Sequence, residues 1–166
     1  MARYNDQAAA DRIWRHPRYR ELYEKLQEQE SERIFCGHAL DHFLAVARLM
    51  QIRNLEENAG LPPDEIYAAA LLHDLGRAVG KERGLPHHLA ALEDAEIIMK
   101  DAGFTKEECT SVLEAIASHR DAGIAEEKSL RGFLYKADKS SRLCMICPAA
   151  AECSWPEEKR NLVICR

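Results

Sequence analysis

The chain of 166 residues lacks the features that assign a protein to a membrane, to secretion or to nucleic acid. No apolar run approaches the roughly 20 residues that span a bilayer. The first residues, Met1–Asp6, contain no signal-peptide core. No segment is strongly basic, as a face that binds nucleic acid would be. We therefore expect a cytoplasmic protein that binds neither membranes nor nucleic acid.

The chain also lacks internal repeats, low-complexity segments, domain linkers and alternating β-branched runs. Helix formers dominate instead, 46% of residues are apolar, 31% are charged and the net charge is −5. These properties predict an all-α fold, a compact helical bundle with a real core. We expect a helical domain over residues 1–143, including an N-terminal helix, and a Cys-containing tail over 144–166 that packs on it.

Apolar residues at helical spacing predict the positions of the main helices. A cap at Ser31 and a capping box of Thr105 with Glu108 would begin two of them. Residues 77–86, rich in Gly, Pro and cationic side chains, indicate a mobile loop. The predicted helices cover residues 18–29, 32–58 with a bend at Gly37, 63–74, 87–103, 105–120 and 130–143.

One stretch, Ala68–Gly76, organises the chain, because an apolar helix there leads directly into His73 and Asp74. Burying a charged carboxylate is costly unless a partner compensates, and an adjacent imidazole and carboxylate suggest a cation as that partner. The alternative is an exposed helix end, with Asp74 in solvent and Gly76 as a C-cap.

Further imidazoles and carboxylates lie on, or at the ends of, other predicted helices. In a bundle such side chains can converge on a cofactor, and a mixed N and O set suits Fe, Mn, Co, Ni or Zn. There are enough donors for two ions, which Asp74 could bridge. Taken singly, each residue has an ordinary structural alternative, as a hydrogen-bonded core histidine, a solvated helix end or an ion pair. The set is His42, His73, Asp74, His87, His119 and Asp138.

The order and spacing of these residues resemble a known family. Residues 42–48 (HFLAVAR), 70–76 (ALLHDLG) and 137–139 (ADK) are similar to the His, His-Asp and Asp motifs of the HD superfamily of metal-dependent phosphohydrolases. The resemblance covers about residues 32–142. It implies an all-α fold and a metal site built from His42, His73, Asp74 and Asp138.

Two further histidines, His87 and His119, resemble those that complete a second metal position in dinuclear members. The small subgroup that hydrolyses diadenosine tetraphosphate is similar in size and also has Ala-Asp-Lys near its end. His38 remains an alternative to His42, and His88 an alternative to His87. Nothing after the His-Asp pair resembles the signature of the subgroup that degrades cyclic di-GMP.

The resemblance implies hydrolysis of a phosphoester or phosphoanhydride in a small, nucleotide-like substrate by a metal-activated hydroxide. One or two divalent transition-metal ions, Fe or Mn, would be held around Asp74, which also serves as a catalytic residue. Arg77, Arg120 and Lys139 are the candidates to neutralise phosphoryl charge. For each of these three, ordinary surface charge is the alternative.

The last residues contain cysteines in a spacing that suits a second metal site, either Zn or an iron–sulfur cluster. Its candidate ligands are Cys144, Cys147, Cys153 and Cys165. Reduced free thiols are the alternative. The two other cysteines, Cys36 and Cys109, are expected to be small buried hydrophobic residues within helices.

Two other kinds of function remain open at this point. One is a non-catalytic helical domain that binds metal or nucleotide, with the Cys tail reading iron or redox state. The other is a helical scaffold without metal. Nothing in the sequence specifies an oligomeric state.

Overall fold

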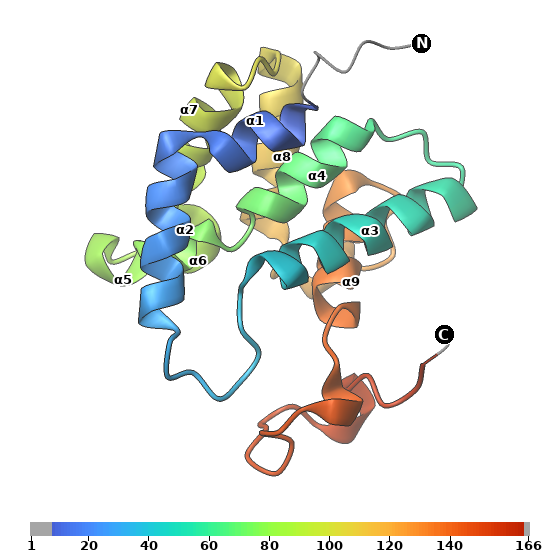
Figure 1. The fold of residues 1–166 in the computed structure, drawn as a ribbon. Helices are drawn as coiled ribbons and strands as arrows, with labels where there is room; N and C mark the ends of the chain where they lie inside the picture. The colour runs from blue at the N-terminus through green and yellow to red at the C-terminus, as the bar shows by residue number, and fades with distance from the viewer. Residues whose placement is uncertain (1–7, 165–166) are drawn as a thin grey trace.

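The computed structural model describes residues 8–164, and within them it contains nine α-helices, four short 3-10 helices and no strand (Figure 1). The all-α prediction is therefore confirmed. No helix in this part of the chain is both long and apolar enough to cross a membrane. The α-helices are α1 (Ala9–Arg15), α2 (Pro17–Gln29), α3 (Leu40–Glu56), α4 (Pro63–Leu72), α5 (Gly80–Arg83), α6 (His87–Ala90), α7 (Leu92–Asp101), α8 (Lys106–Ser118) and α9 (Leu130–Ser140). The 3-10 helices are η1 (Leu75–Ala78), η2 (Ala122–Ile124), η3 (Cys144–Ile146) and η4 (Glu157–Lys159).

Helix α4 lies at the centre of the bundle and packs against α1, α3, α8 and α9 (Figure 1). Its second half is buried on every side, from Ala68 to Leu72. The three consecutive alanines, Ala68 to Ala70, carry only a methyl group each, so neighbouring helices can approach α4 from several directions. The end of α4 is thereby enclosed by the helices that carry the other predicted ligands.

The predicted helix over residues 32–58 begins later, at Leu40, and Ser31 does not cap it. Glu30 explains the difference, because its carboxylate accepts hydrogen bonds from the backbone N–H of His38 (2.9 Å) and from the His38 ring (2.6 Å). These bonds hold residues 31–39 as an irregular loop. The hydroxyl of Tyr23 then accepts from the backbone N–H of Leu40 (3.0 Å) where α3 begins.

Residues 77–86 also differ from the predicted loop, since they contain the end of η1 and all of α5. The buried carboxylate of Asp94 holds them in place. Asp94 accepts from Arg83 of α5 (2.8 Å) and from Arg18 of α2 (2.7 Å). Arg83 also donates to the carbonyl of Ala90 (2.6 Å), next to Ala91, where the predicted helix over 87–103 divides into α6 and α7.

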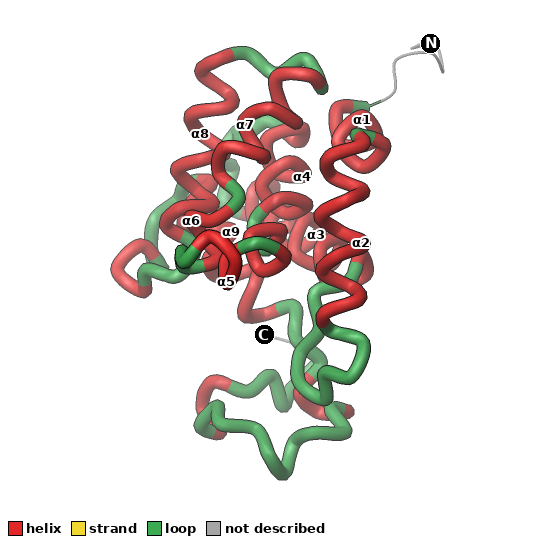
Figure 2. Tube along the Cα trace, turned by 90° about the vertical axis from the view of Figure 1, so that its left-hand side faces the viewer, coloured by secondary structure: helices red, strands yellow, loops and turns green. Residues whose placement is uncertain are grey.

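After α9, which ends at Ser140 rather than Leu143, the chain forms a tail of turns and two 3-10 helices beneath the bundle (Figure 2). Among the large and small apolar residues of 144–164, Ala149 alone is buried. The side chain of Asn161 donates to the carbonyls of Lys139 (2.8 Å) and Arg142 (2.9 Å), so the tail folds back onto the end of α9. The division into residues 1–143 and 144–166 stays a prediction.

The predicted capping box is present: the Thr105 hydroxyl accepts from the N–H of Glu108, and Glu108 accepts from the N–H of Thr105. We expect Thr105→Ala to lower the free energy of unfolding by about 1 kcal/mol, because a donor at the start of α8 loses its partner. Thr110→Ala, the same change at an exposed position within α8, should be neutral or slightly stabilising. Chemical denaturation measures both, and equal losses would contradict this role of Thr105.

Candidate metal centre

The His-Asp pair follows α4 directly, where the chain leaves the helix for η1. Both side chains are buried, with exposed fractions of 0% for His73 and 1% for Asp74. The alternative of an exposed helix end is therefore wrong. Gly76 is also buried, and it is not among the described glycines with a left-handed backbone, so it is not a C-cap of the expected kind.

Asp74 presents one carboxylate oxygen, Oδ2, to imidazoles from the start of α3 and the end of α4. Oδ2 lies 3.1 Å from Nε2 of His73 and 4.0 Å from Nε2 of His42. Asp138 on α9 completes this side, because its Oδ1 lies 3.5 Å from Nε2 of His42 and 3.7 Å from Nε2 of His73. Ligand atoms of these four residues all lie within 4.8 Å of one another.

The other oxygen of Asp74, Oδ1, faces a second set of imidazoles. It lies 3.3 Å from Nε2 of His87 on α6 and 3.9 Å from Nε2 of His119, which follows α8. These three residues form a second group with ligand atoms within 4.8 Å of one another. Two donors at right angles, each about 2.1 Å from one ion, would lie about 3.0 Å apart, so both groups have the spacing of a metal site.

Hydrogen bonds at the far nitrogen fix which imidazole nitrogen faces the site. Nδ1 of His73 donates to the carbonyl of Ala70 (2.8 Å), and Nδ1 of His119 donates to the carbonyl of Ile116 (2.7 Å). Because a carbonyl oxygen only accepts, Nδ1 must carry the proton in both rings, which leaves the Nε2 lone pair for the site.

His42 is oriented in the same way by Ser141. The Ser141 hydroxyl donates to the carbonyl of Asp138 (2.8 Å), so its oxygen accepts from Nδ1 of His42 at 3.1 Å. Nε2 of His42 and Nε2 of His73 are both buried without a hydrogen-bond partner among the described residues. Buried polar atoms seldom lack a partner. These two orphaned nitrogens, facing two carboxylates, fit a bound cation.

The electrostatics of the two sides differ. Burial, and then the positive charge of Arg77, lower the pKa of His87 to about 3. Burial and the charge of His73 lower the pKa of His119 to about 4. Both rings are therefore neutral donors near neutral pH. Burial also acts on His73, but the adjacent Asp74 and the nearby Asp138 outweigh it and raise its pKa to about 10. A cation bound at Nε2 of His73 would therefore displace a proton from that nitrogen.

The two carboxylates remain ionised despite their burial. Desolvation by itself would raise the pKa of Asp74, but His73 and Arg77 hold it well below its usual range. Burial by itself would also raise the pKa of Asp138, but the neighbouring His42 and His73 hold it well below its usual range. The centre therefore presents two negative charges to buried imidazoles, as a site for a divalent cation requires.

His38 also reaches this centre, although it precedes α3 and does not share a helix with His42. It is buried, its Nδ1 lies 2.6 Å from Oε1 of Glu30, and its Nε2 lies 3.5 Å from Oδ2 of Asp74. It belongs to neither group of mutually close ligand atoms. Glu30 was not identified from the sequence, because it is eight residues away across an irregular turn and no spacing rule connects them.

The choice between His87 and His88 is clearer in the structure. His87 belongs to the second ligand group, whereas His88 does not. The His88 ring lies 6.1 Å from that of His119 and is partly exposed. The geometry therefore favours His87.

The cationic side chains take different positions around the centre. Arg77 donates to Oδ1 of Asp74 (2.8 Å), and Lys139 donates to Oδ2 of Asp138 (3.3 Å), so both are paired with carboxylates of the site. Arg142, which was not among the sequence candidates, lies 3.6 Å from Oδ1 of Asp138. Arg120 is exposed, and its charge contributes to the lowered pKa values of His87 and His88.

The cysteines do not join either ligand group. Three of the predicted ligands, Cys144, Cys147 and Cys153, line a cavity of ≈ 670 Å³ that extends to His42. Cys165 lies outside the described residues. Cys36 was expected in a helix as a buried hydrophobic residue. Instead it lies half-buried in the 31–39 loop and lines the same cavity, because Glu30 and His38 hold that loop out of α3.

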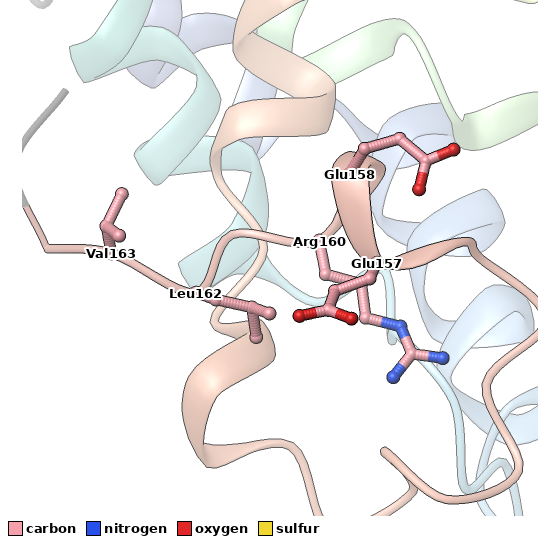
Figure 3. A pocket seen from close by; sticks show the side chains of 5 residues that line it. All are labelled: Glu157, Glu158, Arg160, Leu162 and Val163. Carbon is pink, nitrogen blue, oxygen red and sulfur yellow. The ribbon is translucent and has the colours of Figure 1, made fainter.

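A separate open pocket of ≈ 470 Å³ lies within the tail itself (Figure 3). Its lining combines two carboxylates, one guanidinium and two aliphatic side chains: Glu157, Glu158, Arg160, Leu162 and Val163. None of the predicted site residues lines it.

Comparison with known proteins agrees with this geometry. Residues 39–149 match the HD domain family, and the chain belongs to that family. It is also 39% identical over 135 residues to an uncharacterized protein of Clostridium beijerinckii, an alignment that covers 81% of this chain and 84% of that protein. No solved structure matches the chain.

Gly76 permits the close approach that brings His87 to the centre. A Cβ at position 76 would overlap the backbone carbonyl of His87, because η1 and α6 are in direct contact there. We expect Gly76→Ala to lower the free energy of unfolding by about 1–3 kcal/mol, the usual cost of overpacking, and to reduce bound metal. Gly37→Ala is the control, since its Cβ would meet only Glu30 at 4.0 Å. Denaturation and elemental analysis test both, and a neutral Gly76→Ala would refute the packing argument.

Proposed function

We propose that this HD-domain protein is a metal-dependent phosphohydrolase that cleaves a phosphoester or phosphoanhydride of a small, nucleotide-like substrate. The observation that carries the proposal is the pair of ligand groups that share Asp74, one on each carboxylate oxygen. HD domains are typically metal-dependent hydrolases, and the family match supports this class.

His42, His73, Asp74 and Asp138 would hold one ion, and Asp74, His87 and His119 would hold a second. Imidazole nitrogen with carboxylate oxygen is a donor set that suits Fe or Mn. When bound, such ions lower the pKa of a water molecule and offset charge on phosphoryl oxygens. The likeness to the diadenosine tetraphosphate hydrolases extends this proposal to dinucleoside polyphosphates.

The five described cysteines form no disulfide, which suits the proposed cytoplasmic setting.

The protein's own residues perform the remaining tasks. Asp74, held by Arg77, keeps a full negative charge between the two ligand groups. Lys139 is fixed by the Asp138 carboxylate and by the carbonyl of His119 (3.3 Å). The role of Lys139 is therefore to orient Asp138. A side chain that contacts the substrate should instead be an exposed cation.

Arg120 is such an exposed cation. It follows His119, and among the described residues its side chain forms no ion pair or hydrogen bond. Arg offers phosphate two parallel donors. Arg120 therefore supplies the positive charge that receives a phosphate group beside the second ligand group.

Asp74→Asn tests the reaction class. We expect this variant to lower kcat by more than about 100-fold and to reduce the amount of bound metal. The loss in kcat should exceed the loss caused by changing a residue that only supports a metal ligand. A panel of phosphate esters and dinucleoside polyphosphates, assayed with added Mn or Fe, measures the first effect, and elemental analysis the second. Asp64→Asn, an exposed change at the other end of α4, should leave both unchanged. A wild-type protein that binds metal but turns over no substrate would favour a sensor domain instead.

Arg120→Gln tests substrate binding. We expect KM to rise about tenfold with little change in kcat, because a contact made equally in the ground and transition states is lost. Lys106→Gln removes one positive charge from the opposite end of α8 and should leave KM unchanged. An unaltered KM for Arg120→Gln, or an equal rise in both variants, would exclude a specific role for Arg120.

A further inference from the structure

Four of the five described cysteines line one cavity, although they come from two distant segments. Cys36 lies in the 31–39 loop, and Cys144, Cys147 and Cys153 lie in the tail. Both segments lie on the same side of the bundle (Figures 1 and 2). All four side chains are half-buried, and none forms a disulfide. The fifth, Cys109, is buried in α8 and does not line this cavity.

From this arrangement we propose that Cys36, Cys144, Cys147 and Cys153 hold an iron–sulfur cluster. The site is distinct from the His/Asp centre and does not depend on the proposed hydrolysis. Cys36 supplies the fourth thiolate, which the sequence had assigned to Cys165.

The packing of the tail supports a bound inorganic group. Apolar side chains that could form a small core are exposed instead, including Leu143 at 68% and Ile146 at 73%. The tail is fixed largely by polar contacts, such as those of Arg160 with the carbonyls of Ala150, Cys153 and Trp155. A segment that buries so little apolar surface usually needs a metal or a disulfide to define its fold, and binding to four thiolates supplies that energy.

The cysteine sulfurs of the described residues do not form the tight group that one zinc ion would require. Zinc lies about 2.3 Å from each thiolate, which places four sulfurs about 3.8 Å apart. Among the described residues, no three cysteine sulfurs form a group within 4.8 Å of one another. Thiolates that bind different irons of a cluster are spread more widely than this, and the cavity of ≈ 670 Å³ has room for such a group.

The positive charge of the cavity lining also supports a bound cluster. Arg33, Arg142 and Arg160 line it, against one carboxylate, that of Asp41. An iron–sulfur cluster with four thiolate ligands is an anion, and nearby positive charge and hydrogen-bond donors stabilise it. Arg142 also joins the two cysteine-bearing segments directly, because it donates to the carbonyl of Gly37 (2.7 Å).

The full-length protein, purified without oxygen and reconstituted with ferrous iron and sulfide, tests the proposal. We expect about two to four acid-labile sulfides per chain, the content of the common cluster types, with visible absorption that dithionite bleaches. Cys36→Ser and Cys144→Ser should each lower the labile sulfide by more than half. Cys109→Ser, which changes a cysteine outside the cavity, should retain it.

The Asp74→Asn variant separates the cysteine site from the His/Asp centre. This variant should lose the iron bound at the His/Asp centre but keep the labile sulfide of the cysteine site. Far-UV circular dichroism confirms that each variant retains its helices. Stoichiometric zinc without labile sulfide in the wild-type protein would overturn the proposal. Full sulfide in Cys36→Ser, together with its loss in Cys165→Ser, would overturn the assignment of Cys36.

Discussion

The burial of one carboxylate, Asp74, imposes the main constraint on this structure. A charged carboxylate inside an apolar bundle is costly unless several groups offset it. Here Arg77 donates to it, and imidazoles from the start of α3, the end of α4, α6 and the end of α8 surround it. These segments must therefore converge on one point, and the alanines of α4 make that convergence possible because they leave room around the helix end.

The same constraint explains why the members of the two ligand groups could be predicted from the sequence. His73 and Asp74 lie at the end of an apolar helix, where burying an imidazole and a carboxylate is costly unless a partner compensates. His42, His119 and Asp138 each lie beside a helical apolar stripe, so their convergence follows once the helices pack. The capping box at Thr105 could also be predicted, because it depends only on residues three positions apart.

The errors arise where long-range contacts override local patterns. Glu30 holds His38 and interrupts a helix that the apolar spacing extended to residue 32. Ser141 orients His42 across 99 positions of the chain, and no local signal marks it. Cys36 was assigned to a core because its partners in the cavity are more than 100 positions away in sequence. In each case the determining contact joins segments whose proximity only the fold creates.

The Cys-lined cavity and the His/Asp centre share the short segments that connect them. Cys36 is two residues from His38, and Cys144 is three residues from Ser141, which orients His42. His42 itself contributes to the wall of the cavity. A cluster bound by both the 31–39 loop and the tail would restrain the chain at two places, at the start of α3 and at the end of α9. The order of the tail and the orientation of His42 are therefore linked through Ser141 and Arg142, rather than through the apolar core around α4.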